Sequence, residues 1–128
     1  MSSFEHIRIT QLNKAACRSL NGKLFEMHLE LSAIPPPEWC RFFQEAWEET
    51  FHLTNRNVQI MDKEILIPST PDELEGEHLF YLKRASRSAN EKYEGLLGLR
   101  QKRYQEQMAL REEQKQHLDE IEGRLDFS

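Results

Sequence analysis

The stretch KLFEMHLELS, residues 23–32, followed by IPPPEWCRFF, residues 34–43, decides the fold of this chain. In the first part apolar and polar side chains alternate. One face would carry Phe25, Met27, Leu29 and Leu31, and the other Glu26, His28 and Glu30. Alternation with a period of two predicts a strand with one buried face and one face toward water.

Three consecutive prolines separate this strand from the next element. Proline lacks an amide hydrogen, so the sheet ladder is expected to stop near Ser32. Pro37 suits the first position of a helix, and Glu38 complements the positive end of the helix dipole. The following spacing predicts one aromatic helix face, made of Trp39, Phe43, Ala46, Trp47 and Phe51. The prolines are therefore interpreted as a rigid connection rather than a proline-type recognition segment.

Further strands are expected on both sides of this pair. Residues 6–10 alternate, with Ile7 and Ile9 on one face. Residues 58–68 form two short runs around an Asp62-Lys63 turn, and Pro68 is expected to close the second run. Residues 13–20 leave two alternatives open: a short helix, or a strand leading into a hairpin turn at Asn21-Gly22.

The second half of the chain is predicted to be helical. Thr70, Pro71 and Glu73 form a capping box with proline in the first helical position. A helical stripe of six turns follows, made of Leu74, His78, Leu82, Ala85, Ala89, Tyr93 and Leu96. Gly95 and Gly98 weaken the pattern, and a break or kink there is favoured over one continuous helix.

These elements predict an α+β fold: a small, mostly antiparallel sheet of about four strands with helices on one face. A C-terminal helical hairpin or a projecting long helix completes it. Residues 1–98 are expected to form the core domain and residues 99–128 a helical extension.

The composition argues against a membrane-spanning protein and against a secreted protein held together by disulfides. The chain has 128 residues, a net charge of −5 and two cysteines, with no apolar run long enough to cross a bilayer. No secretory leader pattern is seen at the N-terminus, and Cys17 and Cys40 are expected to stay unpaired. The predicted location is the cytoplasm.

Motifs for catalysis are sparse. No zinc spacing, nucleophile elbow or phosphate-binding glycine loop occurs, so no enzyme activity, metal or cofactor is predicted. His28 is interpreted as part of a solvated strand face and His78 as a partly buried structural residue. An active site would require distant residues such as His28, His52 and Glu64 to converge.

Charge and periodicity single out the last helical region. Residues 83–103 contain seven Lys and Arg and only two Glu, a net charge of +5. The predicted electrostatic contacts are Lys83, Arg84, Arg87, Arg100 and Arg103. The predicted apolar contacts, near heptad spacing, are Tyr104, Met108, Leu118 and Ile121.

The expected function is that of a non-enzymatic interaction module. Its C-terminal helices would pair with a second copy, as a homodimer, or dock on a larger protein. The alternative is a nucleic-acid-binding accessory protein that uses the basic segment Lys83–Arg103. A third interpretation of that segment is that its charges only pair with the protein's own acidic surface. No membrane and no small-molecule substrate are predicted as partners.

Overall fold

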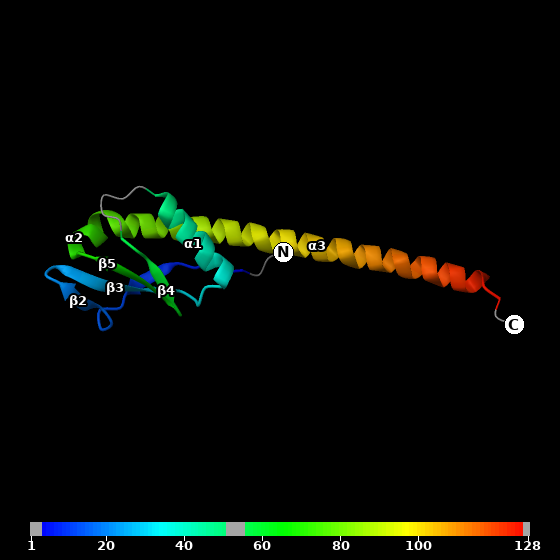
Figure 1. Cartoon of the computed structure of the whole chain (residues 1–128), viewed down its shortest axis with the longest axis horizontal. Helices are drawn as coiled ribbons and strands as arrows, with labels where there is room; N and C mark the ends of the chain where they lie inside the picture. Colours follow the sequence, from blue (N-terminus) through cyan, green and yellow to red (C-terminus); the bar gives the residue numbers. More distant parts are fainter. Residues whose placement is uncertain (1–3, 51–55, 127–128) are drawn as a thin grey trace. The chain divides into compact units, whose positions relative to one another are not determined.

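A computed structural model describes residues 4–50 and 56–126, and the chain divides into two compact units, Ser3–Glu94 and Gly95–Ser128. The first unit contains the sheet and helix α1 (Pro37–Glu49), and the second contains the later part of the long helix α3 (Leu79–Arg124) (Figure 1). The α+β class, the antiparallel sheet and the long C-terminal helix are confirmed.

The sheet has five strands: β1 (Ile9–Leu12), β2 (Arg18–Asn21), β3 (Leu24–Leu31), β4 (Gln59–Met61) and β5 (Glu64–Ser69). Their order is β1-β3-β5-β4, β2 also pairs with β3, and every pairing is antiparallel. The fifth strand is β2, because the hairpin alternative for residues 13–20 is the one that forms. Its turn is Gly22-Lys23, one residue later than the predicted Asn21-Gly22, since Asn21 still pairs with Leu24. Gly22 has a φ of +55° that glycine adopts without strain.

Both β1 and β2 pair with the same edge of β3, because β5 occupies the other edge from Phe25 to Glu30. The segment between β1 and β2 bulges out beside His28. There the His28 carbonyl accepts a hydrogen bond from the Asn13 amide (2.8 Å), and the His28 amide donates to the Cys17 sulfur (3.3 Å). Side-chain sulfur thus replaces one backbone partner in the ladder.

Two strand boundaries differ from the expected ones. β1 begins at Ile9 instead of His6, because the backbone of Ile7 is held by side chains of α3 and not by a strand. β5 continues through Pro68 to Ser69. Proline is tolerated there because β4 pairs only with Glu64–Leu66, which leaves no ladder partner for the missing amide hydrogen.

α1 begins at Pro37, directly after the proline run, as predicted. Its buried residues are Trp39, Phe43 and Trp47, while Ala46 is half-buried and Phe51 lies outside the described residues. The Trp39 and Phe43 rings stack with centroids 5.4 Å apart. Each such side chain contributes about 1.5–3 kcal/mol by leaving water.

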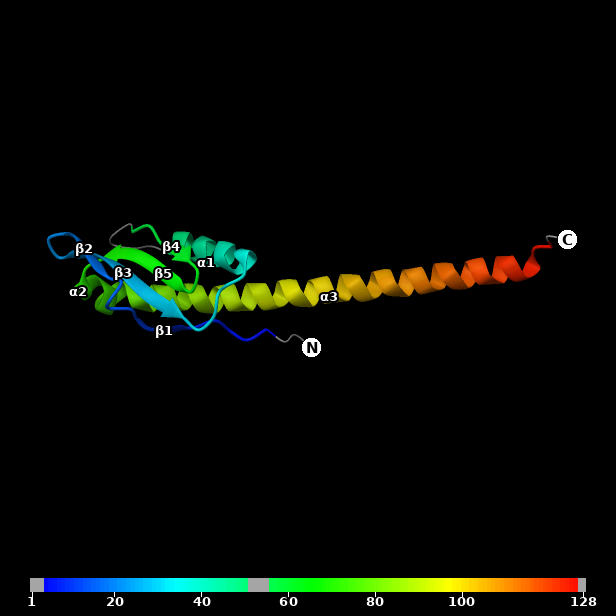
Figure 2. The same ribbon diagram turned by 90° about the horizontal axis from the view of Figure 1, so that it is seen from below.

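Helix α1 and residues 79–94 of α3 cover one face of the sheet (Figures 1 and 2). Asn90 joins three segments in this layer: its Oδ1 accepts from the Ile7 amide (2.9 Å) and from Trp39 Nε1 (2.8 Å), and its Nδ2 donates to the Ile7 carbonyl (2.9 Å). Asn90 is 3% exposed, so these bonds satisfy polar groups that have no access to water.

The helical half begins as predicted, with the reciprocal capping box of Thr70 and Glu73 at α2 (Pro71–Glu73). A π-helical turn, η1 (Leu74–His78), connects α2 to α3. His78 is fully buried, with Nδ1 2.7 Å from Ser69 Oγ, which supports its structural interpretation.

The expected break at the glycines is wrong, because α3 continues from Leu79 to Arg124 without interruption. Glycine in a helix interior costs about 1 kcal/mol relative to alanine. Gly95 and Gly98 are followed by a run of Leu, Gln, Lys, Arg and Glu, whose high helix propensity offsets that cost. The irregularity of this half lies at η1, where no proline or pair of glycines marks it.

Candidate interaction sites

The part of α3 in the second unit has no buried residue: positions 98–126 are all exposed. The four predicted apolar contacts lie here, with exposures of 62% for Tyr104, 45% for Met108, 66% for Leu118 and 49% for Ile121. Three further large apolar side chains are exposed in the same unit: Leu99, Leu110 and Leu125.

These side chains form two neighbouring lines on the helix. Tyr104, Leu118 and Leu125 lie fourteen and seven residues apart, with Arg111 at the heptad position between the first two and Met108 one turn beyond Tyr104. Leu99, Leu110 and Ile121 recur every eleven residues, close to three full helical turns. The prediction missed Leu99 and Leu110, and the eleven-residue spacing is the signal that could have found them. We refer to the seven residues together as the apolar stripe.

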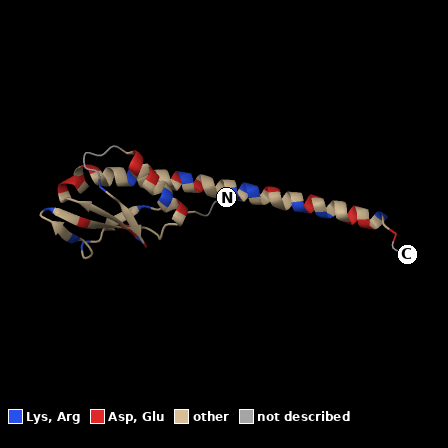
Figure 3. Cartoon of the chain, viewed as in Figure 1, with Lys and Arg blue, Asp and Glu red and all other residues tan. Residues whose placement is uncertain are grey.

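Charge along the same segment is divided between its halves. Residues 99–111 contain four Lys and Arg and one Glu, a net charge of +3. Residues 112–126 contain six Asp and Glu and two Lys and Arg, a net charge of −4. Figure 3 shows acidic and basic segments alternating along α3. The segment therefore has a positive half and a negative half.

The predicted basic residues are divided between the two units. Lys83, Arg84 and Arg87 are exposed on α3 within the first unit, whereas Arg100 and Arg103 belong to the second. Lys83 and Arg87 line a hollow of about 390 Å³ together with Arg8. Arg84 instead lines a hollow of about 480 Å³ between α1 and α3, beside Glu49 and Tyr81.

The interpretation that these charges only neutralise the protein's own acidic surface finds little support near the first hollow. Within the described residues, the side chains of Arg8, Lys83 and Arg87 have no hydrogen-bond or ion-pair partner. By contrast, Arg18 pairs with Glu26 and Arg56 with Glu73. The first hollow therefore collects cations that are not neutralised internally.

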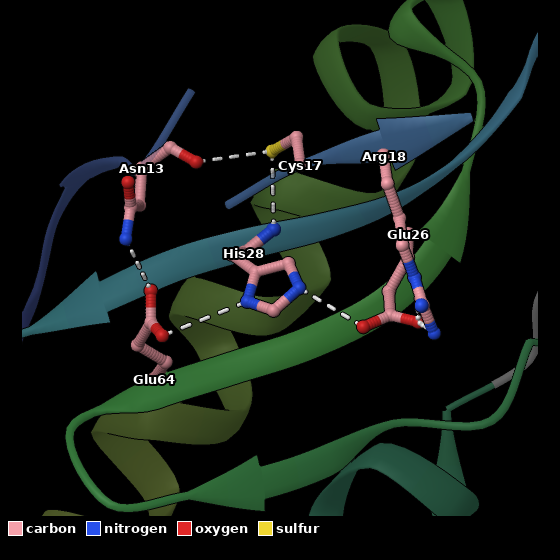
Figure 4. A network of polar contacts seen from close by, with 6 residues as sticks. All are labelled: Asn13, Cys17, Arg18, Glu26, His28 and Glu64. Carbon is pink, nitrogen blue, oxygen red and sulfur yellow. Dashed lines mark hydrogen bonds and ion pairs between the residues drawn. The ribbon is translucent and has the colours of Figure 1, made fainter. Parts of the chain in front are cut away.

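A separate polar network lies on the sheet face opposite the helices (Figure 4). His28 Nε2 is 2.9 Å from Glu26 Oε1, and His28 Nδ1 is 3.6 Å from Glu64 Oε1. Arg18 donates to the second oxygen of Glu26 (2.9 Å), and Asn13 donates to the second oxygen of Glu64 (2.9 Å). This face is less exposed to solvent than predicted, because the His28 side chain is only 14% exposed.

The electrostatics of this network are set mainly by Arg18. Its hydrogen bond lowers the pKa of the Glu26 carboxyl; desolvation opposes this shift, and His28 adds to it. Each carboxylate here is therefore already engaged by a neighbour. The thiol of Cys17 contacts the His28 backbone and the Asn13 carbonyl rather than the imidazole. In this geometry the network braces β3 against β5 and the β1–β2 connection.

The remaining His, Glu and Cys side chains considered for catalysis or metal binding do not form a reactive site within the described residues. His28 and Glu64 do approach each other, while His52 lies outside the described residues. Within residues 4–50 and 56–126, no group of three or more His, Cys, Asp or Glu side chains could hold a metal ion. Cys17 and Cys40 are free, and burial raises the pKa of the Cys40 thiol.

No described helix combines the length and the apolar character needed to cross a membrane. Comparisons with family models, with curated proteins and with solved structures find no match to this chain. Its function must therefore be argued from its own surfaces.

Proposed function

We propose that this protein is a non-catalytic interaction module that pairs with a second copy of itself through the apolar stripe of α3. The observation that carries the proposal is the exposure of all seven apolar side chains on a helical segment with no buried residue. A helix of this kind is marginal in water unless it packs on a partner.

The charge division of the segment favours a second copy as that partner. In an antiparallel pair, the positive half of each helix lies beside the negative half of the other. A parallel pair would place like charges together. A two-fold arrangement also satisfies both copies with one self-complementary surface, which is the commonest form of homodimer.

One antiparallel register places an apolar pair and an oppositely charged pair next to each other. With the two-fold axis between Glu112 and Glu113, Tyr104 of one copy lies opposite Ile121 of the other. Arg103 then lies opposite Glu122, so a charged pair flanks the apolar contact. Arg111 and Lys115 fall in the middle of the seam, where they weaken the pairing.

Charge reversal tests both the pairing and its direction. Arg103→Glu alone and Glu122→Lys alone should each weaken dimerisation, since each places like charges opposite one another. The double variant should restore dimerisation in an antiparallel pair but not in a parallel one. Sedimentation equilibrium measures the effect, which we expect to be about 0.5–1 kcal/mol for each reversed pair.

Leu118→Lys provides the larger perturbation of the same surface, with Gln116→Lys as its matched control on the opposite side of the helix. We expect Leu118→Lys to produce monomers and Gln116→Lys to leave the association unchanged. Equal behaviour of the two variants would refute the stripe as the contact surface.

A further inference from the structure

The hollow of about 390 Å³ in the first unit lies between the N-terminal segment at Ile7–Ile9 and the face of α3 from Lys83 to Asn90. Its volume falls within the roughly 300–1,000 Å³ typical of small-ligand sites. It has no part in the proposed pairing, because none of its lining residues belongs to the second unit.

The chemistry of the rim is strongly one-sided. Arg8, Lys83 and Arg87 contribute three positive charges, and no carboxylate side chain lines the hollow. The imidazole of His6, also on the rim, is 2.8 Å from Glu94 and so already has an acidic partner. Lys83 and Arg87 are four residues apart on one helix face, a spacing at which like charges repel. An anion bound between them would convert that repulsion into attraction.

The walls of the hollow are held in place before any ligand arrives. The Ile7 carbonyl accepts hydrogen bonds from Ser86 Oγ and Asn90 Nδ2, both at 2.9 Å. The Arg8 amide donates to Ser32 Oγ (3.0 Å), and the Arg8 carbonyl accepts from the Ser32 amide (2.8 Å). The backbone that carries Arg8 is thus fixed opposite Lys83 and Arg87, so the conformational cost of binding is mainly that of ordering the three cationic side chains.

We propose that this hollow binds the phosphate group of a small organic phosphate. Two guanidinium groups and one ammonium group match a dianion with several acceptor oxygens better than they match a single carboxylate. Ile9, half-buried at the same hollow, offers an apolar surface for the organic substituent. The sequence does not reveal the site, because Arg8 lies far from Lys83 and Arg87 along the chain.

Phenyl phosphate and inorganic phosphate serve as probes, titrated into the full chain and followed by the amide signals of isotope-labelled protein. We expect phenyl phosphate to shift signals around Arg8 and residues 83–87 and to bind more tightly than inorganic phosphate. Absence of saturable shifts below about 10 mM, an affinity too weak to be specific, would overturn the proposal.

Substitutions test which residues bind phenyl phosphate. Lys83→Gln combined with Arg87→Gln should weaken phenyl phosphate binding at least about tenfold, since two charge-assisted contacts are lost. Arg8→Gln should act in the same direction from the opposite wall. Arg84→Gln is the matched control on the same helix, expected to change affinity less than about twofold because Arg84 lines the other hollow. Equal losses in Arg84→Gln and Arg8→Gln, each of which removes one charge, would show non-specific attraction to a basic surface.

An oligonucleotide distinguishes this site from a nucleic-acid surface. A twenty-nucleotide single strand should compete poorly and lose little affinity in Arg100→Gln or Arg103→Gln. Tight binding with a steep negative salt dependence, abolished by those two variants, would instead make the hollow one part of a backbone-binding surface and overturn the small-ligand proposal.

Discussion

The two parts of α3 share one helix but differ in what stabilises them. Between Leu79 and Glu94 the helix buries Leu82, Ala85, Ala89 and Tyr93 at three- and four-residue spacing. From Gly98 onward it buries nothing. The first part is stabilised because its apolar face packs against the sheet and α1. The second part depends on the helix propensity of its residues and, in the proposed function, on packing against a second copy. Continuity of a helix therefore says little about continuity of its packing.

The largest expected loss of stability comes from a substitution in the packed region. Phe43→Ala removes a side chain with no exposed surface and should lower the free energy of unfolding by about 3–5 kcal/mol. Phe80→Ala is the matched control, because Phe80 is 58% exposed, and should change it by less than about 0.5 kcal/mol. Urea denaturation measures both, and similar losses would contradict the described core.

An intermediate effect sharpens the contrast within α3. A Cβ at Gly95 or Gly98 would meet no atom within 4 Å apart from those of its chain neighbours and of the surrounding helix backbone. Each change to alanine should therefore stabilise the local helix by about 0.5–1 kcal/mol. Amide hydrogen exchange should slow around residues 95–110 while exchange in β3 and β5 stays unchanged. Slower exchange throughout the protein would show that the two regions are one cooperative unit.

The smallest expected effect concerns acid. Because the pKa of Glu26 is lowered from 4.5, its ionised form contributes stability above that value, which is lost as the pH falls through the folded-state pKa. Glu26→Gln should therefore flatten the decline of the unfolding midpoint between about pH 5 and pH 3.

The control for this acid effect is Glu48→Gln, an exposed position on α1. It should leave the decline as steep as in the unsubstituted chain. If the unfolding midpoint of the Glu26 variant fell equally steeply with pH, the network in Figure 4 would not contribute to the acid sensitivity of the fold.

Local pattern predicted most of the fold. The alternation of β3, the proline start of α1 and the Thr70–Glu73 capping box each act over a few residues, and each is present. The prediction of a break at Gly95 and Gly98 was wrong because it compared the low helix propensity of two glycines with that of only a few neighbouring residues. The longer run of residues with high helix propensity that follows outweighs the two glycines. The π turn η1 contains a single glycine, Gly76, which the sequence pattern did not single out as an irregularity.

The candidate sites were predictable only in part. Exposure of Tyr104, Met108, Leu118 and Ile121 agrees with their sparse periodic spacing on an otherwise polar helix. The grouping of Arg8 with Lys83 and Arg87, and of His28 with Glu64, depends on strand register and helix packing between distant segments. No spacing rule along the chain contains that information.

Sedimentation of the full chain beside a truncation after Gly98 tests the central claim most directly. The truncation removes most of the second unit and keeps every strand and α1. Over a concentration series up to about 200 μM, which reaches micromolar dissociation constants, the full chain should approach twice its mass of 15.2 kDa. The truncated chain should remain monomeric, and its circular dichroism spectrum should lose only the helical signal of the removed residues. Equal monomeric behaviour of both proteins at every concentration would contradict self-association through α3.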